Sequence, residues 1–351
     1  MMVTAFDHPV LSSLLVDPEV ERLFGFEAEL SAMLSFERAL AKVQAAHGLI
    51  SSDAAAAIAK ACSAFQPDIS ALRASTQRDG VIVPGLISQL RAGLDESLAG
   101  YVHFGATSQD VIDTALMFRL KPLLAHFGTR LEALETQLSD LSTRFGENSL
   151  MGHTRMQPAL DITVADRIDS WRAPLHRHRA RLASLASSLL VVQLGGAVGT
   201  LDQLGGKAKA IRASLASELS LGDAPQWHSQ RDHIADLSHW LSLVTGTLGK
   251  LGLDIALMAQ AGSEIALSGG GGSSAMPHKR NPVAAETMIS LARFNAVQVS
   301  AMHHALVHEQ ERSGAAWTLE WLTLPQMLAA TGAALRHAGN LLSSISQLGQ
   351  R

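Results

Sequence analysis

Cysteine, tyrosine and charged residues are all scarce in this sequence. Cys62 is the single cysteine among 351 residues, and Tyr101 is the single tyrosine. One cysteine excludes a disulfide scaffold and a zinc site built from cysteines. Charged residues make up 17% of the chain, below the usual share of about 25%, and the formal net charge is -4. Nucleic-acid binders normally carry a basic surplus, so we expect no nucleic-acid partner.

Signals for secretion and for membrane insertion are also lacking. Residues 1–10 contain no basic region followed by an apolar run, so we expect no signal peptide. The longest stretch without a charge runs from Leu182 to Leu201 and is long enough to span a bilayer. Serine, threonine, glutamine and glycine dilute its apolar content, so we expect the end of a buried helix and then a bend. These features favour a cytoplasmic protein without a membrane segment.

The composition predicts an all-α fold. Alanine, leucine, glutamine, arginine and glutamate dominate, and runs of β-branched residues are rare. Several of the expected helices are long and only weakly amphipathic, so other helices must cover them, including helices of other subunits. An elongated helical bundle is favoured. The expected helices cover residues 18–48, 53–65, 110–146, 158–194, part of 202–225, 232–267 with kinks at Gly246, Gly249 and Gly252, 282–312 and 324–342.

The strongest local signal is GGGGSSAMPHKRNP at residues 269–282. Four consecutive glycines are costly to order, which is typical of a hinge or a surface linker. The serines and cations that follow also fit a lid that closes over an anionic substrate. The residue chemistry alone leaves both interpretations open.

Two further polar clusters stand beside predicted helices. HFGATSQD at 103–110 offers the hydroxyls of Thr107 and Ser108, although Ser108 or Asp110 would also serve as an ordinary helix cap. GHTRMQ at 152–157 contains His153, which titrates near neutrality unless its surroundings shift it. His304 and His308 lie four residues apart on a predicted helix, but no HExxH motif accompanies them, so we expect no metal site.

These three clusters together resemble the signature regions of the fumarase/aspartase superfamily. The regions read HFGATSQD, GHTRMQPA and GSSAMPHKRNP here and occur in the family's order. The resemblance covers nearly the whole chain. It implies a long-helix bundle assembled as a homotetramer, with each active site combining the three regions from three different subunits.

Within the superfamily, three segments most resemble those of bacterial 3-carboxy-cis,cis-muconate cycloisomerases. They are GATSQDVIDTAL at 105–116, WHSQRDHIAD at 227–236 and HEQERSGAAWTLEWLTLP at 308–325. This likeness implies an intramolecular lyase of protocatechuate (β-ketoadipate) catabolism that closes a tricarboxylate to a lactone without a metal or another cofactor. Adenylosuccinate lyase, or another lyase that releases fumarate, is the alternative. A non-catalytic helical oligomer on the same scaffold is a third.

The resemblance assigns roles residue by residue. Ser273 matches the catalytic serine, and His153 matches the histidine that protonates the leaving group in the lyases. Lactone formation involves a carboxylate of low basicity, so we expect His153 to orient substrate instead. Arg155 departs from the pattern, because the lyases often carry histidine or leucine at this position. We expect Arg155 to bind a third anionic group of the substrate. The residues expected to bind substrate are Thr107, Ser108, Thr154, Arg155, Gln157, Lys279, Asn281 and Arg312.

The length of the chain predicts its domain organisation. Residues 1–105 are expected to form an N-terminal helical domain, and residues 106–351 the central long-helix bundle. Full-length relatives continue into a further small helical domain, so we expect that domain to be absent or reduced to the part after about residue 324.

Overall fold

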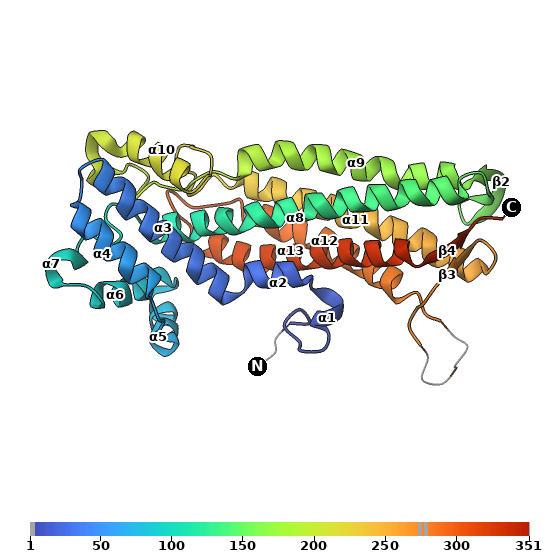
Figure 1. Cartoon of the computed structure of the whole chain (residues 1–351), viewed down its shortest axis with the longest axis horizontal. Coiled ribbons are helices and arrows are strands. Elements are labelled where there is room, and N and C mark those ends of the chain that lie inside the picture. The colour runs from blue at the N-terminus through green and yellow to red at the C-terminus, as the bar shows by residue number, and fades with distance from the viewer. Residues whose placement is uncertain (1–3, 273–275, 277–279, 351) are drawn as a thin grey trace.

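Five long helices run side by side and form most of the molecule (Figure 1). A computed structural model describes residues 4–272, 276 and 280–350 of the chain. The helix α11 packs against α9, α12 and α13, while α8 packs against α9 and α13. One continuous hydrophobic core fills the space between them. The five helices are α8 (Ser108–Phe145), α9 (Val164–Leu189), α11 (Asp232–Ala261), α12 (Val283–His304) and α13 (Gly314–Ser343).

A second hydrophobic core lies at one end of the bundle, around the helix α3 (Phe26–Ala46). The first turns of α8 and Trp317 of α13 reach into this second core, as does the segment 192–219. The other helices of this region are α4 (Ser52–Ser63), α5 (Ile69–Asp79), α6 (Val83–Ala92), α7 (Glu96–Ala99) and α10 (Ala208–Glu218), with the 3-10 helix η1 (Asp202–Lys207). The boundary expected between residues 105 and 106 stays a prediction.

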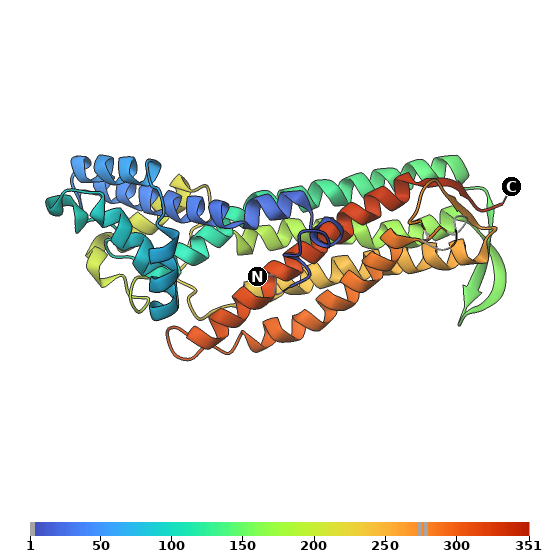
Figure 2. The ribbon, with the colours of Figure 1, turned by 90° about the horizontal axis from the view of Figure 1, so that it is seen from below.

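The remaining helices and strands are short. The helices α1 (Ser12–Leu15) and α2 (Pro18–Phe24) lie against α13. The strands β1 (Ser149–Thr154) and β2 (Gln157–Thr163) form a hairpin, which projects from the far end of the bundle in Figure 2. The strands β3 (Ile265–Leu267) and β4 (Ile345–Leu348) form a second antiparallel pair.

The all-α prediction is confirmed, with local corrections. The segment around Gly152 and Pro158 is a β-hairpin, whereas the sequence predicted a turn and the start of a helix. The expected helix 18–48 is interrupted at Gly25, where α2 ends and α3 begins. The cap of α4 is Ser51, whose hydroxyl accepts the Ala54 N–H at 3.1 Å, and not Asp53. The helix α12 ends at His304, well before residue 312.

The two most apolar segments of the chain, residues 182–201 and the helix α11, are packed within the fold. In the stretch 182–201, α9 ends at Leu189 and the rest is loop, as expected. The helix α11 is long and apolar enough to cross a bilayer by length and composition. It packs against three neighbouring helices, and core helices of water-soluble bundles pass the same test.

The glycines of α11 do not interrupt the helix, although the sequence suggested that they break or kink it. The helix is continuous from Asp232 to Ala261. A Cβ atom at Gly249 would lie 2.6 Å from Cβ of Ala292, and one at Gly252 would lie 3.0 Å from the Ala285 carbonyl oxygen. These glycines therefore let α11 and α12 approach closely.

This close approach predicts opposite effects of two glycine-to-alanine changes. Gly249→Ala should lower the free energy of unfolding by about 1–3 kcal/mol, because the new methyl group overpacks the interface. Gly339→Ala in α13 meets only ordinary contacts, the nearest at 3.8 Å, and should raise stability by up to about 1 kcal/mol. Urea denaturation of both variants measures the difference, and equal effects would contradict the packing role of Gly249.

Candidate active site

The first signature segment forms the N-terminus of α8. The helix begins at Ser108, and Thr107 occupies the cap position, whereas the sequence offered Ser108 or Asp110 as the cap. The Thr107 N–H donates to Oδ2 of Asp110 at 3.0 Å, which is the return half of a capping box. Free backbone N–H groups and the positive end of the helix dipole make such a terminus favourable for an anion.

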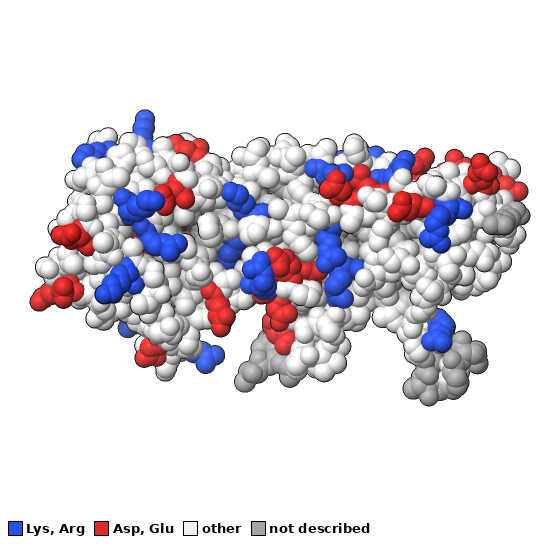
Figure 3. Space-filling model, in the orientation of Figure 1, with Lys and Arg blue, Asp and Glu red and all other residues white. Residues whose placement is uncertain are grey.

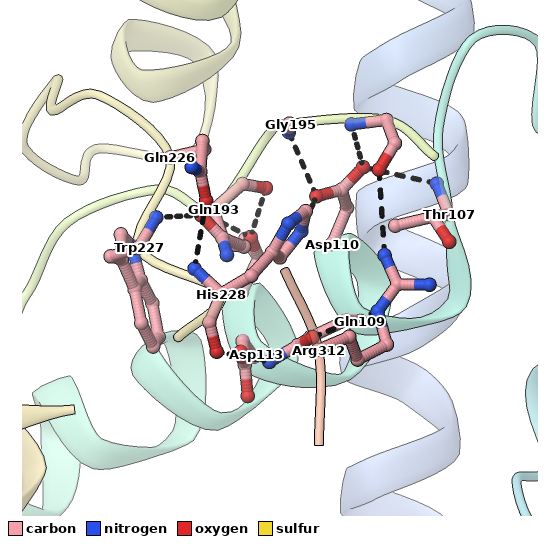
Figure 4. Close-up of polar contacts among 12 residues, drawn as sticks. Thr107, Gln109, Asp110, Asp113, Gln193, Gly195, Gln226, Trp227, His228 and Arg312 are labelled. Atoms are coloured by element: carbon pink, nitrogen blue, oxygen red, sulfur yellow. Dashed lines mark hydrogen bonds and ion pairs between the residues drawn. The ribbon is translucent and has the colours of Figure 1, made fainter. Parts of the chain in front are cut away.

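Asp110 joins this terminus to two other loops (Figure 4). Its carboxylate is fully buried and also accepts the N–H groups of Gly195 and Gly196, both at 2.9 Å. Oδ1 is 2.8 Å from Nε2 of the equally buried His228. With the Thr107 N–H, four groups therefore converge on one carboxylate, which holds the loops 195–196 and 226–230 against the start of α8.

Arg312 approaches the same terminus from a distant part of the sequence. Its Nε donates to Oε1 of Gln109 at 3.0 Å (Figure 4). Its Nη2 donates to the carbonyl oxygen of Ala197 at 3.1 Å. The structure thus brings three of the predicted substrate-binding residues, Thr107, Ser108 and Arg312, into one neighbourhood.

A buried ion-pair network lies one turn further along α8. Arg231 is 2% exposed and donates to both carboxylate oxygens of Asp113, at 2.6 and 3.1 Å. It also donates to both oxygens of Glu320, at 2.9 and 2.6 Å. Burial alone would lower the pKa of Arg231, but the two carboxylates outweigh burial and raise it. Gln109 connects this network to Arg312, because its Nε2 donates to Oδ2 of Asp113 at 3.1 Å.

His103 in the first signature segment is turned away from that terminus. Its backbone has a left-handed φ of 63°, and its Nδ1 is 2.6 Å from Oε1 of the buried Glu37. Burial lowers the pKa of His103, and the charge of Glu37 raises it by more, so the net shift is upward.

The second signature segment is the β1–β2 hairpin. Arg155 and Met156 form its tip, and both have positive φ angles, 49° and 66°. Residues with side chains avoid this conformation, which hairpin tips normally fill with Asn-Gly. Thr154 and Gln157 face one another as the last strand pair.

The hairpin covers a basic cleft of about 630 Å³. His153 and Arg155 line it together with Arg167 of α9 and Lys250 of α11. Lys250 is paired with Asp254, whereas Arg155 and Arg167 have no ion-pair partner within the described ranges. Asp254 and Glu264 also line the cleft, so its three cations Arg155, Arg167 and Lys250 outnumber its carboxylates by one.

The third signature segment is described only in part. Ser273 and Lys279 lie outside the described residues. The ends of the loop are paired, because Gly271 and Asn281 exchange backbone hydrogen bonds of 3.0 and 2.9 Å. Asn281 lines a cavity of about 300 Å³ with His337 and Asn340 of α13.

Within one chain these segments stand far apart. The 38 residues of α8 rise about 57 Å between the first segment and the hairpin. The 30 residues of α13 rise about 45 Å between the end near Arg312 and the end near Asn281. One chain therefore presents the first segment at one end of the bundle and the other two at the opposite end.

The described residues contain no group of three or more histidine, cysteine, aspartate or glutamate side chains placed to hold a metal ion. His304 ends α12, while the side chain of His308 is buried in the following loop, 3.8 Å from Glu320.

His228 and Arg231, whose side chains connect α8 to distant parts of the chain, had no role predicted from the sequence. Their segment, WHSQRDHIAD, carries only the family likeness described above.

The Arg231 network predicts a large cost for removing one partner. Arg231→Met should lower the free energy of unfolding by about 3–5 kcal/mol, because two buried carboxylates lose their counter-charge. Arg22→Met, which removes an exposed pair with Glu19, should change stability very little, because water screens an exposed ion pair. Chemical denaturation at neutral pH compares them. Similar small losses in both variants would show that the network is not essential to the fold.

Comparisons with known proteins agree with this architecture. A family model described as Lyase matches residues 18–297. A 3-carboxy-cis,cis-muconate cycloisomerase of Pseudomonas aeruginosa is 40% identical over 338 residues, which cover 94% of this chain and 73% of the relative.

Two solved structures have the same fold over nearly all of the chain. The crystal structure of 3-carboxy-cis,cis-muconate lactonizing enzyme from Pseudomonas putida has a TM-score of 0.91 and 35% identity, and the match covers 97% of this chain and 77% of that one. The crystal structure of a fumarate lyase from Mesorhizobium sp. BNC1 has a TM-score of 0.88 and 34% identity, covering 95% and 76%. The chain therefore belongs to the lyase family of the fumarase/aspartase superfamily.

Proposed function

We propose that this protein is an enzyme that converts 3-carboxy-cis,cis-muconate to 4-carboxymuconolactone, in the protocatechuate branch of aromatic catabolism. The observation that carries the proposal is the 40% identity to a cycloisomerase across 94% of the chain. The three signature segments support it, because they occur together and in order in the sequence.

The substrate has three carboxylates, and the chain offers cationic or N–H-rich groups in more than one place. The N-terminus of α8, with Thr107 and Ser108 and the neighbouring Arg312, is suited to one carboxylate. The basic cleft under the hairpin is suited to another, with His153, Thr154, Arg155 and Gln157 contributed by the hairpin. Lys279 and Asn281 are assigned to the carboxylate whose charge grows during the reaction.

The reaction is an internal addition. One carboxylate oxygen of the substrate attacks a carbon of a double bond, and the electron pair of that bond moves toward a second carboxylate to form an enediolate. Donors aimed at this developing charge lower the barrier. Ser273 then donates its proton to the carbon next to that carboxylate and regains a proton from solvent, so the product contains all atoms of the substrate and one added proton. Holding the bent cis,cis chain near its attacking geometry provides much of the acceleration.

Assembly into a homotetramer is part of the proposal. The first segment and the other two stand at opposite ends of one chain, so the groups of the first segment cannot meet those of the other two within that chain. A tetramer in which three subunits contribute one segment each would bring them together. Exposed apolar side chains on α11 and α12, such as Leu253 and Val297, fit helix faces that other subunits cover.

A cytoplasmic location completes the proposal. The single cysteine is buried and unpaired, which suits a reducing compartment. Acidic and basic side chains are interspersed over the face in Figure 3, without a broad basic patch that would attract nucleic acid or anionic lipid. The proposed chemistry requires no metal or other cofactor.

A fumarate-releasing lyase is the second candidate, which the structural match to the fumarate lyase favours. Purified protein should remove the ultraviolet absorbance of 3-carboxy-cis,cis-muconate and form the lactone, while adenylosuccinate should remain intact. Fumarate release from adenylosuccinate, with no reaction of the muconate, would overturn the proposal. Turnover of neither compound would favour a non-catalytic oligomer.

The division of roles predicts unequal losses in two variants. Ser273→Ala should reduce kcat about 10³-fold or more, because it removes the proton donor. His153→Gln should have a much smaller effect on kcat and act mainly on KM, because the attacking carboxylate is already ionised and exchanges no proton during the attack. Steady-state kinetics on the muconate compares the two. Equal losses of several orders of magnitude would show that His153 takes part in proton transfer.

A further inference from the structure

A cavity of about 370 Å³ lies where the two hydrophobic cores meet. It is enclosed by the end of α2, the start of α3, the turn between α5 and α6, α8 and α13. None of the residues expected to act in catalysis or to bind substrate lines it, although Asp113 and Glu320 of the Arg231 network do. Its size falls within the range of small-molecule sites, and its lining is mostly apolar with a few charged groups, as such sites usually are.

Arg119 of α8 is the charged group without adequate partners in this cavity. The residue is 8% exposed. Its Nε donates to the Ala115 carbonyl oxygen at a long 3.3 Å, and its Nη2 is 3.5 Å from Oε1 of Glu29. A guanidinium has five N–H donors, and within the described part of the chain the remaining ones have no acceptor. Burial lowers the pKa of Arg119, and Glu29 offsets this only in part.

The acidic side chains around the cavity do not provide acceptors for the remaining N–H donors of Arg119. Asp113 and Glu320 line the cavity but are already bonded to Arg231. Glu29 has 36% of its side chain exposed, so it can turn to solvent without being buried unpaired. An incoming anion would therefore meet Arg119 as the available cation.

Aromatic side chains form the rest of the recognition surface. Trp317 and Trp321 stand next to each other with ring centroids 4.6 Å apart and planes at 57°. Trp317 is fixed by its indole N–H, which donates to Asp113 at 3.3 Å. Phe24 lies under the Arg119 guanidinium, 4.9 Å from ring centroid to Cζ. Flat apolar walls of this kind favour a flat apolar ligand.

We propose that this cavity is a second binding site, separate from the active site, for a small carboxylate with a flat apolar body. The carboxylate binds the Arg119 guanidinium through two parallel N–H donors, a geometry that arginine provides and lysine does not. The body of the ligand packs against Trp317 and Trp321.

Benzoate is the probe for this site, titrated calorimetrically into the intact assembled protein. We expect saturable binding with one site per chain and a Kd of about 1 mM or tighter, as is reasonable for a ligand of this size. Benzamide and benzylamine, which have the same ring but no negative charge, should bind at least tenfold more weakly. Binding of benzylamine as tight as that of benzoate would overturn the assignment of charge, and so would no saturable heat at about 10 mM benzoate.

Matched arginine variants locate the site. Arg119→Met should weaken benzoate binding at least tenfold, and Arg119→Lys should weaken it less, because the charge remains. Arg144→Met, at the far end of α8, and Arg312→Met, beside the proposed active site, should leave benzoate binding unchanged. Urea denaturation checks that each variant is folded. Binding that survives Arg119→Met, or that is lost in Arg312→Met, would overturn the proposal, and both results are independent of whether the protein turns over muconate.

Discussion

The length of α8 is the constraint on which the arrangement of functional groups depends. It is one continuous helix of 38 residues, and it begins at the first signature segment and ends just before the second. A helix of that length is rigid on the scale of an active site and holds its two ends about 57 Å apart. On the other side of the bundle, α13 separates the end near Arg312 from the end near Asn281 by about 45 Å. The chain is therefore built to present partial sites at both ends, which is why we propose that the complete site belongs to an assembly.

The partial site at the start of α8 is held by buried polar groups. Asp110 receives four donors while being fully buried, so its charge is compensated without any contact with water. Arg231 binds two carboxylates a turn further on, and Gln109 bridges that network to Arg312. Such networks are costly when one member is missing, and they favour one geometry when all are present. They explain how loops from four parts of the chain maintain one shape.

The fold was predictable where a pattern reflects local physics. The helix expected to start at residue 18 does start there, and the Asp17 carboxylate caps it by accepting the Glu19 N–H. Other features depend on tertiary contacts that no local pattern contains. Gly249 suggested a kink because glycine is a poor helix former, yet Ala292 of α12 explains its absence of a side chain. The hairpin around Gly152 was missed because its tip is Arg155-Met156, which lacks the glycine or asparagine that normally announces such a turn.

The proposed site could be inferred from the sequence only through family likeness. The sequence motifs named Thr107, Ser108, His153 and Arg312, but nothing local indicated which of them lie together. The structure places Arg312 with the first segment and His153 far from it. His228 and Arg231 were not predicted, because burying a polar side chain depends on partners more than 80 residues away in sequence, and spacing along the chain does not reveal these.

Mixing two variants that are each damaged in a different segment tests most directly whether one active site needs segments from several chains. Ser108→Ala and Ser273→Ala are each assayed alone, then dissociated together, reassembled and assayed on 3-carboxy-cis,cis-muconate. If the segments come from different subunits, random mixing creates sites in which both serines are intact, and about a quarter of the wild-type activity returns. If the mixture is no more active than the two variants alone, each site is built within one chain and the account is wrong.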